Sequence, residues 1–292
     1  MRGNPEAHEL IAASTLSDVL KQLGREPGAW TPIAGGTELM VAHAAGRLNT
    51  PKLINLWGLT ELGFIRVSDD CISIGGGVTF GQIRRHAAIA ADFPLLSRAA
   101  SWIGSIANQN RATLAGNIVN GSPAADAPPA LLVYDAEIEL ISQHGSRQLT
   151  YADFHLGYKQ SVLQPDELVF ALHLPRRFAR HAQYLRKVGA RKAMAITKVA
   201  LAGTAFVEDG TVTEIRLAAA SVADRPLRMA AAESALLGEK LCPETRRGAR
   251  MALLHEVRPI DDIRSTAEYR KFVAANLLDE FLNELSREVL SA

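Results

Sequence analysis

Apolar positions in the first quarter of the chain recur with the spacing of helices and strands. Residues 14–23 predict an amphipathic helix that Ser14 or Thr15 caps and Gly24 closes. The stretch WTPIAGG then predicts a short strand that runs into a glycine turn, and TELMVAHA predicts the start of a helix. This order of strand, glycine turn and helix can present backbone N–H groups to a ligand.

The middle of the chain alternates between the two periodicities. KLINL and CISIGGG predict strands, TFGQIRRHAAIAADF predicts a helix, and a second helix is expected over residues 95–103. EIELIS, RQLTY and ELVFALHLP alternate as strands do, with a turn at residues 144–146. Pro175 and the basic RRFAR that follows predict a domain junction.

The last third predicts a hairpin followed by helices. MAITKVALAGTAFV and TVTEIRLAAAS flank a Glu-Asp-Gly turn at residues 208–210, and helices are expected over residues 227–237 and 243–257. The last helix opens on a capping box at residues 265–268 and carries an apolar stripe that we expect to be core. The chain therefore predicts mixed helix and sheet in at least two domains.

Charge and composition favour a globular protein with small-molecule or protein partners. Lys and Arg number 32 against 31 Asp and Glu, so no net field would attract nucleic acid or an anionic membrane. The basic stretch 176–187 is expected to be a solvated face near the domain junction, or else a contact with a partner subunit. No secretion signal or membrane-length apolar run is present, which predicts a cytoplasmic protein.

Several kinds of site are not expected on this chain. Cys71 and Cys242 stand far apart, which disfavours a disulfide scaffold, a zinc site or an iron-sulfur cluster. The eight histidines lack HExxH spacing, and the G-x-S-x-G frame of a serine hydrolase is absent from the sequence.

The first candidate for chemistry is the segment that ends the predicted strand at WTPIAGG. Its members are Ile33, Ala34, Gly35, Gly36, Thr37, Glu38 and Leu39. Glycines before a helix let backbone N–H groups approach a pyrophosphate, and Thr37 adds a hydroxyl donor. Glu38 would repel a phosphate and suits a sugar hydroxyl better. The alternative is a turn that only joins a strand to a helix.

The second candidate is TLAGNIVNGSPAADAPPAL, residues 113–131, whose one formal charge is Asp126. Gly116 and Gly121 would permit backbone geometry closed to other residues, while Asn117 and Thr113 offer donors and acceptors. An ordinary loop with Asp126 as the N-cap of the next helix explains that carboxylate equally well. Two such loops could hold the two ends of a dinucleotide.

These segments resemble successive motifs of a known family. PIAGGTEL, SIGGGVTFGQI, ATLAGNIVNGSPAADAPPALLVYDAEIEL, KVGARKAMAITKVALA and DIRSTAEYRKFVAANLL resemble, in order, the FAD-binding medium subunit of the xanthine dehydrogenase family of molybdenum hydroxylases. The resemblance covers almost the whole chain. It implies an α+β fold: a two-subdomain FAD-binding domain of the PCMH (vanillyl-alcohol-oxidase-like) type over residues 1–176, divided near residues 57–63. A C-terminal α/β domain like that of CO dehydrogenase flavoproteins would follow over residues 177–292.

The resemblance also implies which residues hold non-covalent FAD. Residues 33–39 match the pyrophosphate segment. A second flavin segment is matched by Thr113, Gly116, Asn117, Val119 and Asp126, with Asp126 expected to hydrogen-bond the cofactor. Val169 and Lys187 match positions near the flavin, and Ile103 stands where a subset of the family has an aromatic residue. No catalytic acid, base or metal ligand is implied.

By the same resemblance the chain would pass electrons within a larger complex. A large subunit with molybdopterin and a small subunit with 2Fe-2S clusters are implied partners, in a dimer of heterotrimers. NAD as final acceptor stays open, because residues 191–198 lack the acidic residues of NAD-using relatives; another acceptor, or an altered NAD site that relies on Lys198, would explain this. The alternatives are an assembly subunit that binds FAD weakly or not at all, and a stand-alone flavin oxidase.

Overall fold

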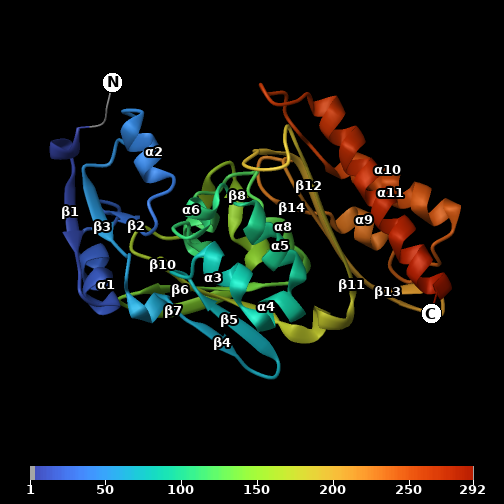
Figure 1. Cartoon of the computed structure of the whole chain (residues 1–292), viewed down its shortest axis with the longest axis horizontal. Helices are drawn as coiled ribbons and strands as arrows, with labels where there is room; N and C mark the ends of the chain where they lie inside the picture. Colours follow the sequence, from blue (N-terminus) through green and yellow to red (C-terminus); the bar gives the residue numbers. More distant parts are fainter. Residues whose placement is uncertain (1–3, 292) are drawn as a thin grey trace.

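The computed structural model describes residues 4–291, which form three main sheets with helices around them (Figure 1). The first sheet is parallel, in the order β1-β3-β2, and lies at one end of the molecule. Its elements, after the short 3-10 helix η1 (Pro5–Ala7), are β1 (Glu9–Ala12), α1 (Leu16–Arg25), β2 (Thr31–Ile33), α2 (Leu39–Ala44) and β3 (Lys52–Asn55).

Helix α1 follows its predicted periodicity and begins at the predicted cap. The Thr15 side chain accepts a hydrogen bond from the Asp18 backbone N–H, and the apolar face of the helix is buried. The prediction that Gly24 closes the helix was wrong, because α1 continues to Arg25. A Cβ atom at Gly24 would lie 2.1 Å from the Gln143 side-chain amide, which would have to move aside to admit it.

The second sheet has five antiparallel strands in the order β4-β5-β10-β6-β7. Its strands are β4 (Ile65–Val67), β5 (Cys71–Gly75), β6 (Glu137–Ser142), β7 (Gly145–Thr150) and β10 (Leu168–Pro175), with η2 (Thr60–Leu62) before it and η3 (Tyr151–Asp153), β8 (His155–Gly157) and β9 (Gln160–Ser161) inserted. Alternate residues such as Ile72 and Ile74 point into the main core, as period-two patterning predicts. The central strand β10 comes from far along the chain, so the sheet forms only when residues 71–75 and 168–175 meet.

Six short helices pack beside this sheet and carry the second candidate segment. They are α3 (Phe80–Arg85), α4 (Ala87–Asp92), α5 (Pro94–Trp102), α6 (Ile106–Gln109), α7 (Leu114–Val119) and α8 (Pro128–Val133). The continuous helix predicted over residues 79–93 is two helices. His86 breaks it with an extended backbone, at ψ 116°, and its ring nitrogen accepts from the Ile89 N–H at the start of α4.

The third sheet is antiparallel, in the order β11-β12-β13-β14, and is covered by the C-terminal helices. Its elements are η4 (Arg176–Arg180), β11 (Ala182–Gly189), β12 (Thr197–Glu208), β13 (Thr211–Ala220), β14 (Leu227–Arg228), α9 (Ala230–Ser234), α10 (Pro243–Glu256) and α11 (Ala267–Ser291). The predicted hairpin turn is confirmed, with Asp209 and Gly210 both at positive φ. The helix predicted over residues 227–237 is shorter, because Leu227 and Arg228 pair with β13 instead.

The two faces of this third sheet pack against different partners. Leu201 and Ala205 share a core cluster with Phe281 of α11, whereas Ala202 and Ala218 join the main core on the α8 side. The α11 stripe was predicted as core, and this is correct for its later members only, since Tyr269 and Phe272 are exposed.

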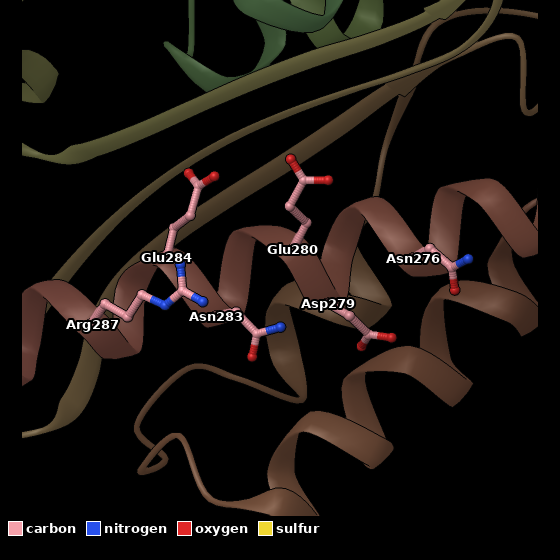
Figure 2. A pocket seen from close by; sticks show the side chains of 6 residues that line it. All are labelled: Asn276, Asp279, Glu280, Asn283, Glu284 and Arg287. Atoms are coloured by element: carbon pink, nitrogen blue, oxygen red, sulfur yellow. The ribbon is translucent and has the colours of Figure 1, made fainter.

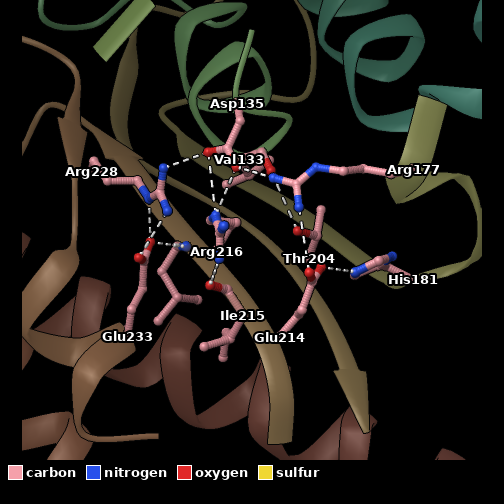
Figure 3. A network of polar contacts seen from close by, with 11 residues as sticks. Val133, Asp135, Arg177, His181, Thr204, Glu214, Ile215, Arg216, Arg228 and Glu233 are labelled. Carbon is pink, nitrogen blue, oxygen red and sulfur yellow. Dashed lines mark hydrogen bonds and ion pairs between the residues drawn. The ribbon is translucent and has the colours of Figure 1, made fainter. Parts of the chain in front are cut away.

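A cluster of ion pairs joins α8 to the third sheet (Figure 3). Asp135, just after α8, accepts hydrogen bonds from Arg177, Arg216 and Arg228. The basic stretch 176–187 was expected to be a solvated face, and this was wrong for His181 and Lys187, whose side chains are only 9% and 10% exposed, whereas Arg177 is 47% exposed. Partners within the chain are Asp92 for Arg176, Asp135 for Arg177, Glu214 for His181 and Asp126 for Lys187.

None of the helices in residues 4–291 is long and apolar enough to cross a membrane.

Candidate functional site

The first candidate segment is a tight connection between β2 and α2. Ile33 ends the strand, Leu39 begins the helix, and residues 34–38 turn between them. Gly36 has a φ of +72°, and a Cβ atom at Gly35 would lie 1.7 Å from the carbonyl oxygen of Arg111. Both glycines are therefore required, one for its conformation and one for close approach to residues that precede the second candidate segment.

Two polar side chains of this connection remain available to a ligand. Thr37 is half-buried, and Glu38 is exposed at the N-cap position of α2 without a side-chain capping bond. Arg111 approaches from the other side, where its guanidinium donates to the Gly35 carbonyl at 3.4 Å and stacks 3.9 Å from the centre of the Trp57 ring. This places a cation beside the predicted pyrophosphate segment, which sequence reasoning missed because residue 111 lies outside both quoted motifs.

The second candidate segment begins with a capped helix. The Thr113 hydroxyl accepts a hydrogen bond from the Gly116 N–H at 3.2 Å, which caps α7. Gly116 was expected to adopt a conformation closed to other residues, but it is helical. A Cβ there would lie 2.9 Å from the Thr113 hydroxyl, so close approach explains this glycine, and only Gly121, at φ +59°, has the left-handed backbone.

Asn117 gives the clearest sign that this segment faces a ligand. Among the described residues its side-chain carbonyl oxygen is buried yet has no hydrogen-bond partner. A buried polar atom without a partner costs roughly 1–3 kcal/mol, so a donor from a bound molecule would be favourable there. Val119, two residues later on the same helix, exposes 45% of its surface and offers an apolar contact. An unpaired amide acceptor suits the hydrogen-bond donors of a flavin or a nucleotide.

The third glycine run, residues 75–77, joins the segments rather than binding by itself. The Gly76 N–H donates to the Phe170 carbonyl, and the Ala115 N–H donates to the Gly76 carbonyl. A Cβ at Gly76 would lie 2.3 Å from the Val169 carbonyl oxygen. The Val169 side chain itself is buried in the main core. α7 and β10 therefore meet at Gly76.

Asp126 is held by two residues of the third sheet. Its Oδ2 accepts from the Lys187 ammonium at 2.7 Å and its Oδ1 accepts from the Thr197 hydroxyl at 2.6 Å. Burial raises the pKa of the Asp126 carboxyl above its ordinary value, while Lys187 and Thr197 oppose the rise. The alternative that Asp126 caps α8 was wrong, because Ala127 occupies the cap position, ahead of two prolines, and no side chain caps the helix.

Lys187 brings a further aromatic residue to the site. Its ammonium lies 5.9 Å from the centre of the Trp102 ring, at the end of α5. Ile103, the predicted flavin neighbour, follows as the C-cap of α5 and packs partly buried against the main core. The structure thus gathers Asp126, Lys187 and Trp102, and adds Thr197. Thr197 was missed from the sequence, because it lies inside the predicted strand MAITKVALAGTAFV and no motif distinguishes it there.

The connection between β11 and β12 is exposed and basic. Arg191 donates to the carbonyls of Ala193 and Met194, and Met194 has a φ of +53°. Lys198 lies over the Tyr269 ring, 5.6 Å from its centre. The side chains of Met194 and Ile196 are more than half exposed.

A hollow of about 300 Å³ lies elsewhere, along α11 (Figure 2). It is lined by Asn276, Asp279, Glu280, Asn283, Glu284 and Arg287, which all belong to this one helix. None of these residues belongs to the predicted site.

Comparison with known proteins defines the class. Residues 6–177 match the family model described as the FAD binding domain in molybdopterin dehydrogenase, and residues 184–285 match the CO dehydrogenase flavoprotein C-terminal domain. The first match covers more than half of the chain. The chain therefore belongs to the family of FAD-binding subunits of molybdopterin dehydrogenases, which confirms the predicted family, fold and cofactor.

Particular relatives agree with this family over most of their length. The nicotinate dehydrogenase FAD-subunit of Eubacterium barkeri is 32% identical, over 85% of each chain. The xanthine dehydrogenase FAD-binding subunit of Escherichia coli is 29% identical, over 93% of this chain and 94% of its own. A solved carbon monoxide dehydrogenase from Hydrogenophaga pseudoflava, which lacks the Mo-pyranopterin moiety of its cofactor, superposes with a TM-score of 0.91 at 27% identity, over 96% of this chain and 97% of its own.

Proposed function

We propose that this chain is the electron-transfer flavoprotein subunit of a multi-subunit molybdenum hydroxylase. Bound FAD would supply the redox chemistry, accepting electrons from a partner's iron-sulfur cluster and passing them to a final acceptor. The unpartnered, buried Asn117 oxygen carries the proposal, because it lies in the segment that the family uses for flavin and would gain a hydrogen bond from a donor on the cofactor.

The two segments would each bind one half of the cofactor. Residues 33–37 would bind the diphosphate through backbone N–H groups, with Glu38 accepting from a ribose hydroxyl. Thr113, Gly116, Asn117 and Val119 would line the flavin half, with Ile103 and the backbone of Val169 beside it. Asp126 and Lys187 complete the site as an ion pair. No side chain in this arrangement needs to act as a general acid or base.

The same proposal includes a division of the chain into domains and a set of partner subunits. Residues 1–176 would form the FAD-binding domain, with two subdomains that meet near residues 57–63, and residues 177–292 the C-terminal domain. Relatives include the medium chain of a carbon monoxide dehydrogenase and the medium subunit of a nicotine 6-hydroxylase. We infer a molybdopterin-containing large subunit and a 2Fe-2S small subunit as partners, in a cytoplasmic dimer of heterotrimers, with NAD as one candidate acceptor.

A visible absorption spectrum of the purified chain tests the proposal. Released cofactor should be FAD by mass, and Gly116→Val should lose it, because a side chain at that position would collide with the Thr113 cap. Gly248→Ala is the matched control, since no atom lies within 4 Å of the added Cβ, and it should keep FAD. A chain that takes up no FAD even with excess cofactor would contradict the proposal and favour an assembly subunit.

A further inference from the structure

The buried carboxylate of Asp126 is bound by two residues from a later part of the chain, Lys187 and Thr197. Asp126 is 8% exposed, Thr197 is 1% exposed, and the Lys187 side chain is 10% exposed. Thr197 donates to one carboxylate oxygen at 2.6 Å and Lys187 to the other at 2.7 Å. Each oxygen keeps a lone pair, so the carboxylate can still accept a hydrogen bond from a ligand.

A second tie joins the same two segments. The Ser221 N–H donates to the carbonyl of Pro123, and the Ser221 hydroxyl donates to the carbonyl of Thr197 at 2.9 Å. Ser221 is buried and has a φ of +64°, a conformation that is costly for a serine and persists only where its surroundings require it. Residues 123–126 are therefore fastened to the start of β12 at two points.

Lys187 and Thr197 also bracket the exposed connection between β11 and β12. Lys187 lies two residues before the end of β11, and Thr197 is the first residue of β12. Both ends of the connection are thus tied to Asp126, whereas the Arg191 bonds within it reach only its own carbonyls. The orientation of Asp126 and the position of this connection depend on each other.

We propose that Thr197 is a positioning residue for the flavin site, acting through Asp126. Its hydroxyl orients the carboxylate and holds residues 123–126 against the third sheet, so FAD affinity depends on a side chain of the C-terminal part of the chain. Lys187 supplies charge but, as a flexible ammonium, little direction. The directional bond comes from the threonine, whose hydroxyl is carried on a stiff, β-branched side chain.

The proposal rests on FAD binding and is tested by titrating FAD into the apo full-length chain. Thr197→Val keeps the shape but removes the donor, and should weaken FAD binding about tenfold or more, as expected for a lost hydrogen bond to a charged group. Thr197→Ser keeps the hydroxyl and should bind within about threefold of wild type. Thr204→Val is the control: Thr204 is also buried on β12, but its hydroxyl makes only a 3.4 Å contact with the Val133 carbonyl.

The outcomes separate this inference from the proposed function. A wild-type chain that binds no FAD overturns both. A wild type that binds FAD overturns the inference alone if Thr197→Val binds equally well, if Thr197→Ser is as weak as Thr197→Val, or if Thr204→Val is weakened to the same extent. If Thr197→Val does not fold, Thr197→Ala removes the same donor with a smaller side chain and should weaken FAD binding as much; unchanged affinity there also overturns the inference.

Discussion

Replacing Asp135 by alanine is expected to lower the free energy of unfolding by about 3 kcal/mol. Asp135 is the shared acceptor for three arginines, at 2.6 Å from Arg177, 3.0 Å from Arg216 and 2.7 Å from Arg228 (Figure 3). Its side chain is 26% exposed, so each pair is weaker than a fully buried one.

The magnitude follows from what each arginine retains. Arg228 keeps Glu233 and Arg177 keeps Glu214, whereas Arg216 keeps only a backbone carbonyl at 3.0 Å. Stranding that one half-buried guanidinium should dominate, at roughly 2 kcal/mol. Asp135 also has a φ of +47°, and alanine adds roughly 1 kcal/mol there.

Asp135→Asn separates the two contributions. Asparagine tolerates the left-handed backbone and can still accept hydrogen bonds, so its loss should be about 1–2 kcal/mol. Urea unfolding followed by circular dichroism measures both variants, and the alanine variant should also melt several degrees lower. An alanine variant within about 0.5 kcal/mol of wild type, or equal to the asparagine variant, would refute this reasoning.

Three further changes test other parts of the structure. Gly35→Ala would place a Cβ 1.7 Å from a backbone carbonyl oxygen, so it should abolish FAD binding and cost roughly 1–3 kcal/mol of stability. Gly248→Ala, inside α10 and with open space around the added Cβ, should keep FAD binding and raise stability by about 0.5–1 kcal/mol; FAD retained by Gly35→Ala would be inconsistent with the loop packing. Burial lowers the pKa of His155 from 6.5 to about 4, so the unfolded chain binds a proton at this residue before the folded chain does. The free energy of unfolding is therefore highest above pH 6.5 and falls by up to about 3 kcal/mol as the pH drops toward 4. His155→Gln should flatten this dependence in unfolding measured at pH 4.5 and 7.5, and an unchanged slope would count against it. Gly203→Ala would meet the Phe281 ring at 2.5 Å and destabilise the chain by about 1–3 kcal/mol, and Phe281→Leu in the same chain should recover part of this loss; no recovery would exclude the clash as the cause.

Local pattern was sufficient for most of the secondary structure. The spacing of apolar residues predicted α1 and its Thr15 cap, because both depend on residues within one or two turns. The Asp209-Gly210 turn was equally predictable, since positive φ at both positions selects those residue types. Predictions of elements were wrong where a distant pairing partner competed with the local preference, as when Leu227 and Arg228 paired with β13.

The glycines also differ in whether their role depends on local conformation or on tertiary packing. Gly36 and Gly121 could be interpreted from the sequence, because their role is a backbone conformation. Gly35 and Gly76 are glycines because the backbone of a segment far away in sequence approaches within 3 Å of where a Cβ would stand. Only the folded structure shows which segment that is.

By itself, the sequence determined that this protein is an α+β member of a flavoprotein family, and it predicted that two glycine-containing segments form the FAD site. These follow from periodicity, turn chemistry and ordered motifs, which are local or linear properties of the chain. The tertiary structure decided that Asp126 binds Lys187 and Thr197 instead of capping α8, and that Arg111 lies beside Gly35. Those contacts join residues more than sixty positions apart. Which donor reaches a buried carboxylate depends on how the sheets and helices pack, because no local preference encodes that distance.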